Sequence, residues 1–378
     1  MKSNVYIIQY DRYILILYMI LMVIGLYMQL NISSIRANMS FFYRQFIWFG
    51  LSIFSLWFAF KVVNLQKVRK FSLLFIIFTI ILLISVLIFG ESVKGAVRSI
   101  SIWKINIQPS LIARIVLIIY FAHILDKRQT LIDNSNPKSF IKNFNALIVI
   151  PLILFLLILI EKHFSLLIIS GLTLISLLFL AKIKYSTIFL IIGILFIMGI
   201  LVIKLGPTYR SERMKIYSKY SLLNKNKNEG TKYKVTGDYQ VKESLISLSS
   251  GKLFGVTPKK GTGKHYFLPE AKTDYIFSII GEEFGFIGSL IVLAIYCYLF
   301  ARSIISSNVK EGLFLKLAGF GLGMNIFFNA MVNIGVSMAA LPSTGVTLPF
   351  ISYGGTSLVV NSFSIGLLLN ISAKRQKI

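Results

Sequence analysis

Acidic side chains are rare in this sequence: Asp and Glu total 14 among 378 residues, against 40 Lys and Arg. Asp274 and Glu282 stand at the start of, and inside, one long apolar run, KTDYIFSIIGEEFGFIG. Ionisable groups in such a run are costly in a membrane and are functional candidates by default. Asp274 has two interpretations, the N-cap of a helix that begins there or a general base at the outer membrane face. Glu282 lies about 12 Å deeper in the same helix, and we expect it to brace two helices through a buried hydrogen bond.

Two arginines and one basic turn are candidates for binding an anion. Arg114 lies about one turn into a predicted helix, four residues after Ser110, so the two side chains share a face. Its rigid fork suits a carboxylate or a phosphate, and the alternative is a side chain that snorkels to the outer interface. Arg98, in the loop GAVRSISIWKINIQPS, has a solvated surface charge as its alternative. Lys264 belongs to GVTPKKGTGK, a basic turn that lacks the spacing of a phosphate-binding loop but could meet an anion.

The spacing of the remaining chemically active residues indicates no metal site. His123, His163 and His265 are far apart in the chain and show no ligand spacing. Cys297 is the only cysteine, so no intrachain disulfide is possible.

The loop near the C-terminus contains the densest group of helix breakers. In LPSTGVTLPFISYGG, residues 341–355, Pro342, Gly345 and Pro349 precede the pair Gly354-Gly355. Non-helical backbone near membrane depth is tolerated only where protein or a cavity covers it. The loop is therefore either a re-entrant connector or one wall of a substrate groove.

The elements that must position these residues are membrane helices. Hydrophobic residues make up 56% of the chain and charged residues 14%, with a mean hydropathy of +0.77, whereas soluble domains are about one quarter charged. The apolar runs are unbroken and long enough for an α-helix to cross a bilayer. We therefore predict an all-α polytopic membrane protein, a single domain over 1–378. The ten predicted spans are 13–31, 46–61, 72–89, 109–125, 145–161, 164–181, 185–204, 275–301, 317–336 and 351–371.

The distribution of Lys and Arg predicts that both termini are cytoplasmic. With that orientation, the inner short loops carry roughly three times as many Lys and Arg as the outer ones. The segment 205–274, between spans seven and eight, is then a large extracytoplasmic loop, flexible over 224–234 and better ordered over 237–274. The formal charge of +26 favours an anionic membrane over nucleic acid, since no long soluble domain is left to carry a basic face.

Four segments resemble the SEDS family, the membrane glycan polymerases of the FtsW and RodA kind. They are NIG followed by LPSTGVTLPFISYGGTS within 333–357, YFLPEAKTDYIFSIIGEEFGFIG over 266–288, GDYQVKESLISLSSGKLFG over 237–255, and QPS from Gln108 to Ser110. The second and third segments are closer to the division branch than to the elongation branch. The ten spans and the large outer loop agree with this family as well.

The resemblance implies a peptidoglycan glycosyltransferase of the bacterial cytoplasmic (inner) membrane. Its substrate would be lipid II, and its partners a class B penicillin-binding transpeptidase and other division or elongation membrane proteins. Asp274 matches the family's essential aspartate and would act as the general base. Gln108, Ser110, Arg98, Arg114 and Lys264 would bind substrate or its diphosphate. Glu282, Pro349, Ser352 and Gly354 would support the site. No cofactor is required by the sequence, and a divalent cation (Mg or Mn) assisting the diphosphate is left open.

The chain departs from the family pattern at three places. The family usually has Glu after QPS, where this chain has Leu111, and Lys at the position of Arg114. It usually has a Pro-Asp pair after the glutamate that ends span five, where this chain has Lys162-His163 after Glu161. Two other hypotheses stay open beside the enzyme: a flippase or transporter for the lipid-linked precursor, and, because the Glu is missing, a weakly active scaffold for division proteins.

Overall fold

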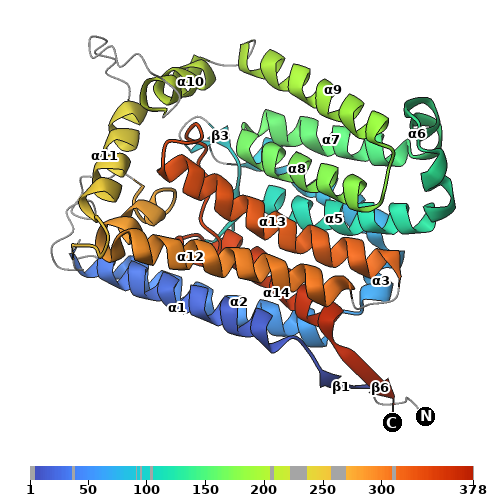
Figure 1. Ribbon diagram of the computed structural model, residues 1–378, viewed down its shortest axis with the longest axis horizontal. Helices are drawn as coiled ribbons and strands as arrows, with labels where there is room; N and C mark the ends of the chain where they lie inside the picture. Colours follow the sequence, from blue (N-terminus) through green and yellow to red (C-terminus); the bar gives the residue numbers. More distant parts are fainter. Residues whose placement is uncertain are drawn as a thin grey trace.

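Long α-helices lying side by side make up most of the molecule (Figure 1). The computed structural model describes residues 5–35, 39–90, 92–93, 96–102, 105–204, 208–221, 236–256, 270–308 and 312–377. Ten of its helices coincide with the ten predicted spans. They are α1 (Arg12–Ile35), α2 (Ser40–Lys61), α4 (Ser72–Phe89), α5 (Pro109–Lys127), α7 (Ala146–Ile160), α8 (Phe164–Leu180), α9 (Tyr185–Lys204), α12 (Ile276–Asn308), α13 (Leu313–Ser337) and α14 (Gly355–Ser372).

Seven of these helices are long and apolar enough to cross a membrane, namely α1, α4, α5, α9, α12, α13 and α14. An eighth span is formed if α7 is taken with the short helix α6 (Pro137–Asn143), from which it is bent by 79°. Helix α8 is apolar but has 17 residues, and α2 has Arg44 and Gln45 near its start, which lower its hydropathy. The predicted all-α polytopic membrane fold is confirmed, and its span count fits approximately.

Helices α5, α13 and α14 form the interior of the bundle. Most of the side chains of α5 are buried, including Arg114, and α13 and α14 are likewise buried along most of their lengths. By contrast, α9 is largely exposed and lies along one edge (Figure 1). The remaining short helices, α3 (Leu65–Lys70) and η1 (Gln129–Asn134), lie in connections between the longer ones.

The N- and C-terminal strands pair with each other. Strand β1 (Val5–Gln9) runs antiparallel to β6 (Lys374–Lys377), so both ends of the chain lie at the same end of the molecule (Figure 1). Two further hairpins precede α5: β2 (Ser92–Val93) with β3 (Ala96–Val97), and β4 (Ile100–Ile102) with β5 (Ile105–Ile107).

Helices α10 (Thr208–Tyr220) and α11 (Thr236–Ser250) lie at the opposite end from the termini and belong to the predicted large loop (Figure 1). A small apolar cluster of Ile216, Val241 and Ala339 joins them to the end of α13. The Ser244 hydroxyl also contacts the Ser278 hydroxyl at 2.6 Å and donates to the Ser337 carbonyl at 2.7 Å. The predicted flexible stretch 224–234 and Lys264 lie outside the described residues.

Candidate active site

A large cavity opens among the helix ends on the α10–α11 side of the bundle. Its volume is about 1090 Å³, which matches the upper range of small-molecule sites. The walls come from the start of α5, the turn between α7 and α8, helix α10, the residues before α12, the loop 343–347 and the start of α14. The sequence therefore folds so that segments far apart in the chain meet at one place.

Asp274 lines this cavity, two residues before the first residue of α12. The backbone around it is held by three successive carbonyl groups. The Lys272 carbonyl accepts from the Tyr353 amide at 2.8 Å, and the Thr273 carbonyl accepts from the Ser352 hydroxyl at 2.6 Å. The Asp274 carbonyl accepts from the buried Asn333 amide at 2.8 Å.

The same side chains also shape the loop that faces Asp274. Asn333 donates a second hydrogen bond to the Val346 carbonyl at 2.6 Å, and the Ser352 hydroxyl accepts from the Leu348 amide at 2.8 Å. Pro349 is held through its carbonyl, which accepts from the buried Tyr296 hydroxyl. The C-terminal loop thus forms a rigid wall, and Asp274 is fixed against it.

Gly345 marks the point at which Asp274 and Arg98 come together. A Cβ added at Gly345 would lie 3.6 Å from Asp274 Oδ2 and 3.9 Å from Arg98 Nη1. Gly345 has φ +72°, a conformation that favours glycine. The carboxylate and one guanidinium group therefore face the same small piece of backbone.

Arg114 lines the cavity from α5 and is 2% exposed. Its Nε and Nη2 atoms are buried and have no hydrogen-bond partner in the described part of the chain. A buried cation normally requires a partner. Two donors of a rigid fork are therefore available to an anion that enters the cavity.

Gln108, Ser110 and His163 form a polar group beside Arg114. His163 Nδ1 lies 3.3 Å from Ser110 Oγ and 3.5 Å from Gln108 Nε2. Burial, assisted by the charges of Arg98 and Arg114, lowers the pKa of His163 to about 3. The imidazole is therefore neutral at physiological pH and leaves the charge of Arg114 uncompensated.

Glu161 follows the last residue of α7, next to this group, and is fully buried. Its two carboxyl oxygens have no hydrogen-bond partner among the described residues. Burial raises its pKa to about 8, against smaller lowering effects of the Ser110 hydroxyl and the Arg98 charge. Glu161 is therefore mostly protonated at neutral pH and does not neutralise its cationic neighbours.

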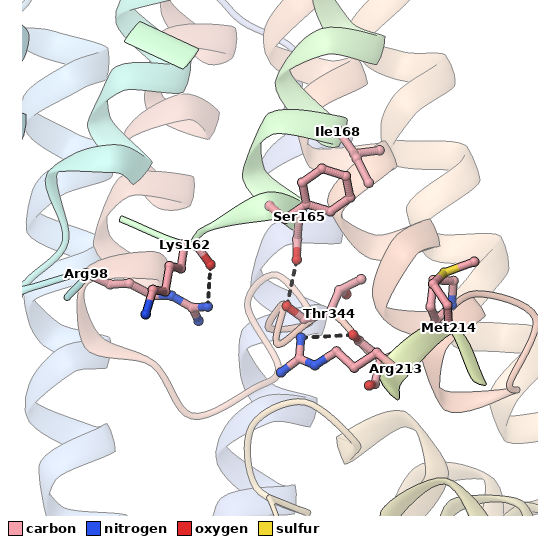
Figure 2. A pocket seen from close by; sticks show the side chains of 10 residues that line it. Arg98, Lys162, Ser165, Ile168, Arg213, Met214 and Thr344 are labelled. Atoms are coloured by element: carbon pink, nitrogen blue, oxygen red, sulfur yellow. Dashed lines mark hydrogen bonds between the residues drawn. The ribbon is translucent and has the colours of Figure 1, made fainter. Parts of the chain in front are cut away.

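A smaller cavity of about 60 Å³ adjoins the large one and shares Arg98, Lys162 and Arg213 with it (Figure 2). Arg98 Nη2 donates to the Lys162 carbonyl at 2.7 Å, and Arg213 Nη1 donates to the Ser343 carbonyl at 3.0 Å. Ser165 donates to the Thr344 carbonyl at 2.6 Å. The Arg98 bond ties the hairpin region to the turn between α7 and α8, and the Ser165 and Arg213 bonds tie α8 and α10 to the C-terminal loop.

The structure brings five of the predicted site residues to the large cavity: Asp274, Arg98, Arg114, Gln108 and Gly354. Three others do not line the cavity but form hydrogen bonds with its lining or with the loop that faces it: Ser110, Pro349 and Ser352. Glu282 is buried in α12, 1% exposed, and does not line the cavity. Lys264 lies outside the described residues, so its predicted contact with an anion stays a prediction.

Sequence reasoning missed Lys162, His163 and Arg213 as members of this site. The charged corner Glu161-Lys162-His163 between two apolar runs was a usable signal, because it places three polar groups at one membrane boundary. Arg213 gave no such signal. It lies among the many basic residues of the large loop, and only the fold of α10 brings it to the cavity.

The large cavity is lined by acidic and basic side chains together. Among the described residues, no group of three or more His, Cys, Asp or Glu side chains is close enough to hold a metal ion. The acids that line the cavity, Glu212, Glu270 and Asp274, are accompanied by four basic residues: Arg98, Arg114, Lys162 and Arg213. The four basic residues suit an anionic ligand.

Comparison with known proteins accounts for the fold. The family model of the FtsW, RodA and SpoVE cell cycle proteins matches residues 8–377. The chain belongs to this family. The resemblance of its motifs is thereby confirmed.

Two relatives are similar along nearly their whole lengths. A probable peptidoglycan glycosyltransferase FtsW of Buchnera aphidicola from Acyrthosiphon pisum is 35% identical over 376 residues, covering 97% of this chain and 90% of the relative. The protein of the same name from Coxiella burnetii is 29% identical and covers 96% of each chain.

Solved structures share the fold. One, described under structural coordination of polymerization and crosslinking by a peptidoglycan synthase complex, gives a TM-score of 0.77 at 20% identity, covering 97% of this chain and 98% of that one. The crystal structure of the rod shape determining protein RodA of Thermus thermophilus gives 0.70 at 20% identity and covers 97% of both chains.

The positions that depart from the usual FtsW and RodA motifs converge in space. Leu111, Arg114 and His163 all line the large cavity, and Glu161 lies next to Ser110. Where the family usually has two carboxylates, this chain has an apolar side chain and a neutral imidazole. The departures at Leu111 and His163 therefore act together on Arg114, because both remove a carboxylate from the cavity that its guanidinium group lines.

Proposed function

We propose that this chain is a peptidoglycan glycosyltransferase of the division branch of its family, extending glycan strands from lipid II. Relatives 29% to 35% identical along nearly the whole chain are named probable peptidoglycan glycosyltransferases. The observation that carries the mechanism is the cavity that Asp274 lines together with the guanidinium groups of Arg98 and Arg114. That combination suits the removal of a proton beside a leaving group that carries negative charge.

In the proposed reaction, the 4-hydroxyl oxygen of the acceptor sugar attacks the anomeric carbon of the donor. Asp274 accepts the hydroxyl proton as the new glycosidic bond forms. The bond between the anomeric carbon and the diphosphate oxygen breaks, and its electron pair leaves with undecaprenyl diphosphate. Asp274 then returns its proton to solvent before the next cycle.

Negative charge grows on the diphosphate as that bond breaks, and preorganised cations stabilise it most when water is excluded. Arg114 supplies two buried donors, and Arg98 faces the same loop as Asp274. Lys162 and Arg213 add positive charge to the walls. Lys264 is proposed as a further contact of the diphosphate. Gln108 and Ser110 act through His163, which fixes the wall next to Arg114.

The proposed setting is the bacterial cytoplasmic membrane, with both termini inside and the cavity facing outward. A class B penicillin-binding transpeptidase is the proposed partner, together with other division or elongation membrane proteins. The similarity in fold to a component of a peptidoglycan synthase complex supports that partner. The placement of cavity and termini at opposite ends of the bundle supports the orientation (Figure 1).

The decisive experiment gives labelled lipid II to the purified chain with its transpeptidase partner and separates the products on a gel. We expect glycan ladders from the wild type and none from Asp274→Asn, because the amide cannot accept the proton. Asp238→Asn is the matched control: Asp238 pairs with Lys219 in the same large loop, outside the cavity, and such surface pairs contribute little.

Two other results would replace the proposal. Movement of lipid II across vesicle membranes without any polymer would make the chain a flippase for the lipid-linked precursor. Binding of the transpeptidase with neither polymer nor lipid movement would make it a scaffold.

A further inference from the structure

Helix α12 is interrupted near its start, and a segment of the large loop completes its hydrogen bonding. At Gly285 the backbone leaves the helical region, with φ 68° and ψ −164°. The Phe286 amide then donates to the Lys252 carbonyl at 2.8 Å, and the Ile287 amide donates to the Leu253 carbonyl at 3.2 Å. The Val256 amide donates to the Glu282 carbonyl at 3.0 Å. Residues 251–256, here called the 251–256 turn, are therefore joined to a membrane helix.

Glycines make this close approach possible. A Cβ on Gly251 would collide with the Gly281 backbone, and one on Gly255 would collide with the Glu283 backbone. A Cβ on Gly285 would in turn collide with the backbone of the 251–256 turn. The 251–256 turn and α12 are therefore in direct backbone-to-backbone contact, which does not depend on side-chain packing.

The two large side chains of the turn do not contribute to the core. Phe254 is 78% exposed and Leu253 is 59% exposed. The hydrogen bonds of the turn place them beside Phe286 and Ile287, which are 60% and 42% exposed on α12. Their exposed surface therefore continues the lipid-facing surface of a membrane span.

The depth of the turn follows from the length of the apolar stretch. Residues 284–301 contain no Asp, Glu, Lys or Arg, and Arg302 at the far end pairs with Asp11 at 2.6 Å. At 1.5 Å per residue such a stretch spans about 27 Å, close to the ~30 Å of the hydrocarbon core. Its Gly285 end, and the turn bonded to it, therefore lie at the membrane–water boundary on the cavity side, where aromatic side chains are favoured.

We propose that the 251–256 turn inserts Leu253 and Phe254 into the leaflet on the cavity side and so anchors α11 to the bilayer. The neighbouring Lys252 is exposed and places its charge at the level of the lipid phosphates. Because α11 contacts Ser278 through Ser244, the anchor couples the bilayer to the helix that follows Asp274. The inference does not depend on the proposed catalytic function.

The test uses an environment-sensitive fluorophore on a single cysteine in the full-length chain. In a Cys297→Ser background, Phe254→Cys is labelled with a nitrobenzoxadiazole dye, and the protein is placed in phosphatidylcholine–phosphatidylglycerol vesicles. We expect blue-shifted emission, quenched by a nitroxide on the upper part of the lipid acyl chain and much less by one near the chain end. Leu253→Cys gives a second, independent reading of the same depth.

Lys242→Cys is the matched control, because Lys242 is exposed and lies on the same helix α11, more than two turns before the turn. Its dye should emit as in water and be quenched by aqueous iodide only. Phe286→Cys, on the exposed surface of α12, gives the reference for a lipid-facing position. If dyes at 253 and 254 both behave like the one at 242, the anchor does not exist.

Discussion

At the scale of single residues, the buried charge of Arg114 is the feature that most distinguishes this chain from the usual motifs of its family. Leu111 and a neutral His163 line the cavity with Arg114, and a mostly protonated Glu161 lies next to Ser110, one turn earlier in α5. A guanidinium group buried without a carboxylate gains most from an anionic ligand, because the ligand supplies the missing partner. The cavity therefore has one subsite at which affinity and stability are coupled.

Arg114→Gln tests this coupling. We expect at least a tenfold loss of polymerisation activity, because about 1.4 kcal/mol of lost transition-state stabilisation is a factor of ten and charge-assisted bonds are worth more than that. The same change should raise the melting temperature of the ligand-free protein, since it removes an unpaired buried charge. Arg114→Lys should keep part of the activity, because the lysine ammonium keeps the positive charge but lacks the paired donors of a guanidinium group. Equal losses of activity and stability in Arg114→Gln would contradict this view.

The pKa values of Glu161 and His163 predict how stability depends on pH. The pKa of Glu161 is raised to about 8 in the folded protein, so the folded state holds a proton that the unfolded chain releases near pH 4.3. The folded protein therefore loses stability as the pH rises from about 4.3 to about 8. The pKa of His163 is lowered to about 3. The unfolded chain therefore binds a proton that the folded protein does not, and stability is lost as the pH drops below about 6.5.

Glu161→Gln isolates the first of these effects. We expect the wild type to melt at a lower temperature at pH 8.5 than at pH 6.5, and the variant to melt at nearly the same temperature at both. Thermal unfolding in detergent, followed by tryptophan fluorescence, measures the difference. A variant that loses as much stability between these pH values as the wild type would contradict the raised pKa of Glu161.

At the scale of elements, the C-terminal loop positions Asp274 through its backbone. Gly345→Ala tests this, because φ +72° costs an L residue about 1 to 2 kcal/mol and the new Cβ would touch both Asp274 and Arg98. We expect a loss of activity of tenfold or more with transpeptidase binding retained. Gly171→Ala in α8 is the control, since its Cβ would meet no atom within 4 Å. If both variants have the activity of the wild type, the loop does not constrain the site.

The helices could be predicted from the sequence, because a membrane span is set by length and hydropathy alone, as α4 and α9 illustrate. The position of Asp274 was predictable for the same reason, since it lies where an apolar run begins. The break at Gly285 and the docking of the 251–256 turn were not. They depend on backbone hydrogen bonds between segments about 30 residues apart, which leave no periodicity in the sequence.

The meeting of Arg114, His163 and Glu161 could likewise not be derived from spacing. These residues come from α5 and from the turn after α7, and their adjacency depends on how α5 packs in the bundle. The sequence showed Arg114 and the charged corner Glu161-Lys162-His163 as two separate features. Their neutral or uncompensated states follow only from burial, which is a property of the fold.

At the scale of the whole molecule, the two ends of the bundle have different characters. One end holds the large cavity together with α10 and α11 (Figure 1). The other holds the paired terminal strands and two ion pairs between helix ends, Arg69 with Asp126 and Arg302 with Asp11. Asp11 also accepts from Ser306, and its amide donates to Ser372, so α1, α12 and α14 are tied together there.

This asymmetry predicts the topology of the chain in its membrane. Because β1 pairs with β6, both termini must lie on one side, and the excess of Lys and Arg in the short loops at that side predicts the cytoplasm. A fluorescent protein fused after residue 378 should therefore be bright. Alkaline phosphatase fused at the same point should be inactive, since it folds only outside the cytoplasm, whereas its insertion between Ser221 and Thr236 should give full activity. The reverse pattern would place the cavity in the cytoplasm, and Asp274 could then not act on a substrate outside the cell. A bright fusion together with active phosphatase at the loop requires the cavity to face outward, where the growing wall lies.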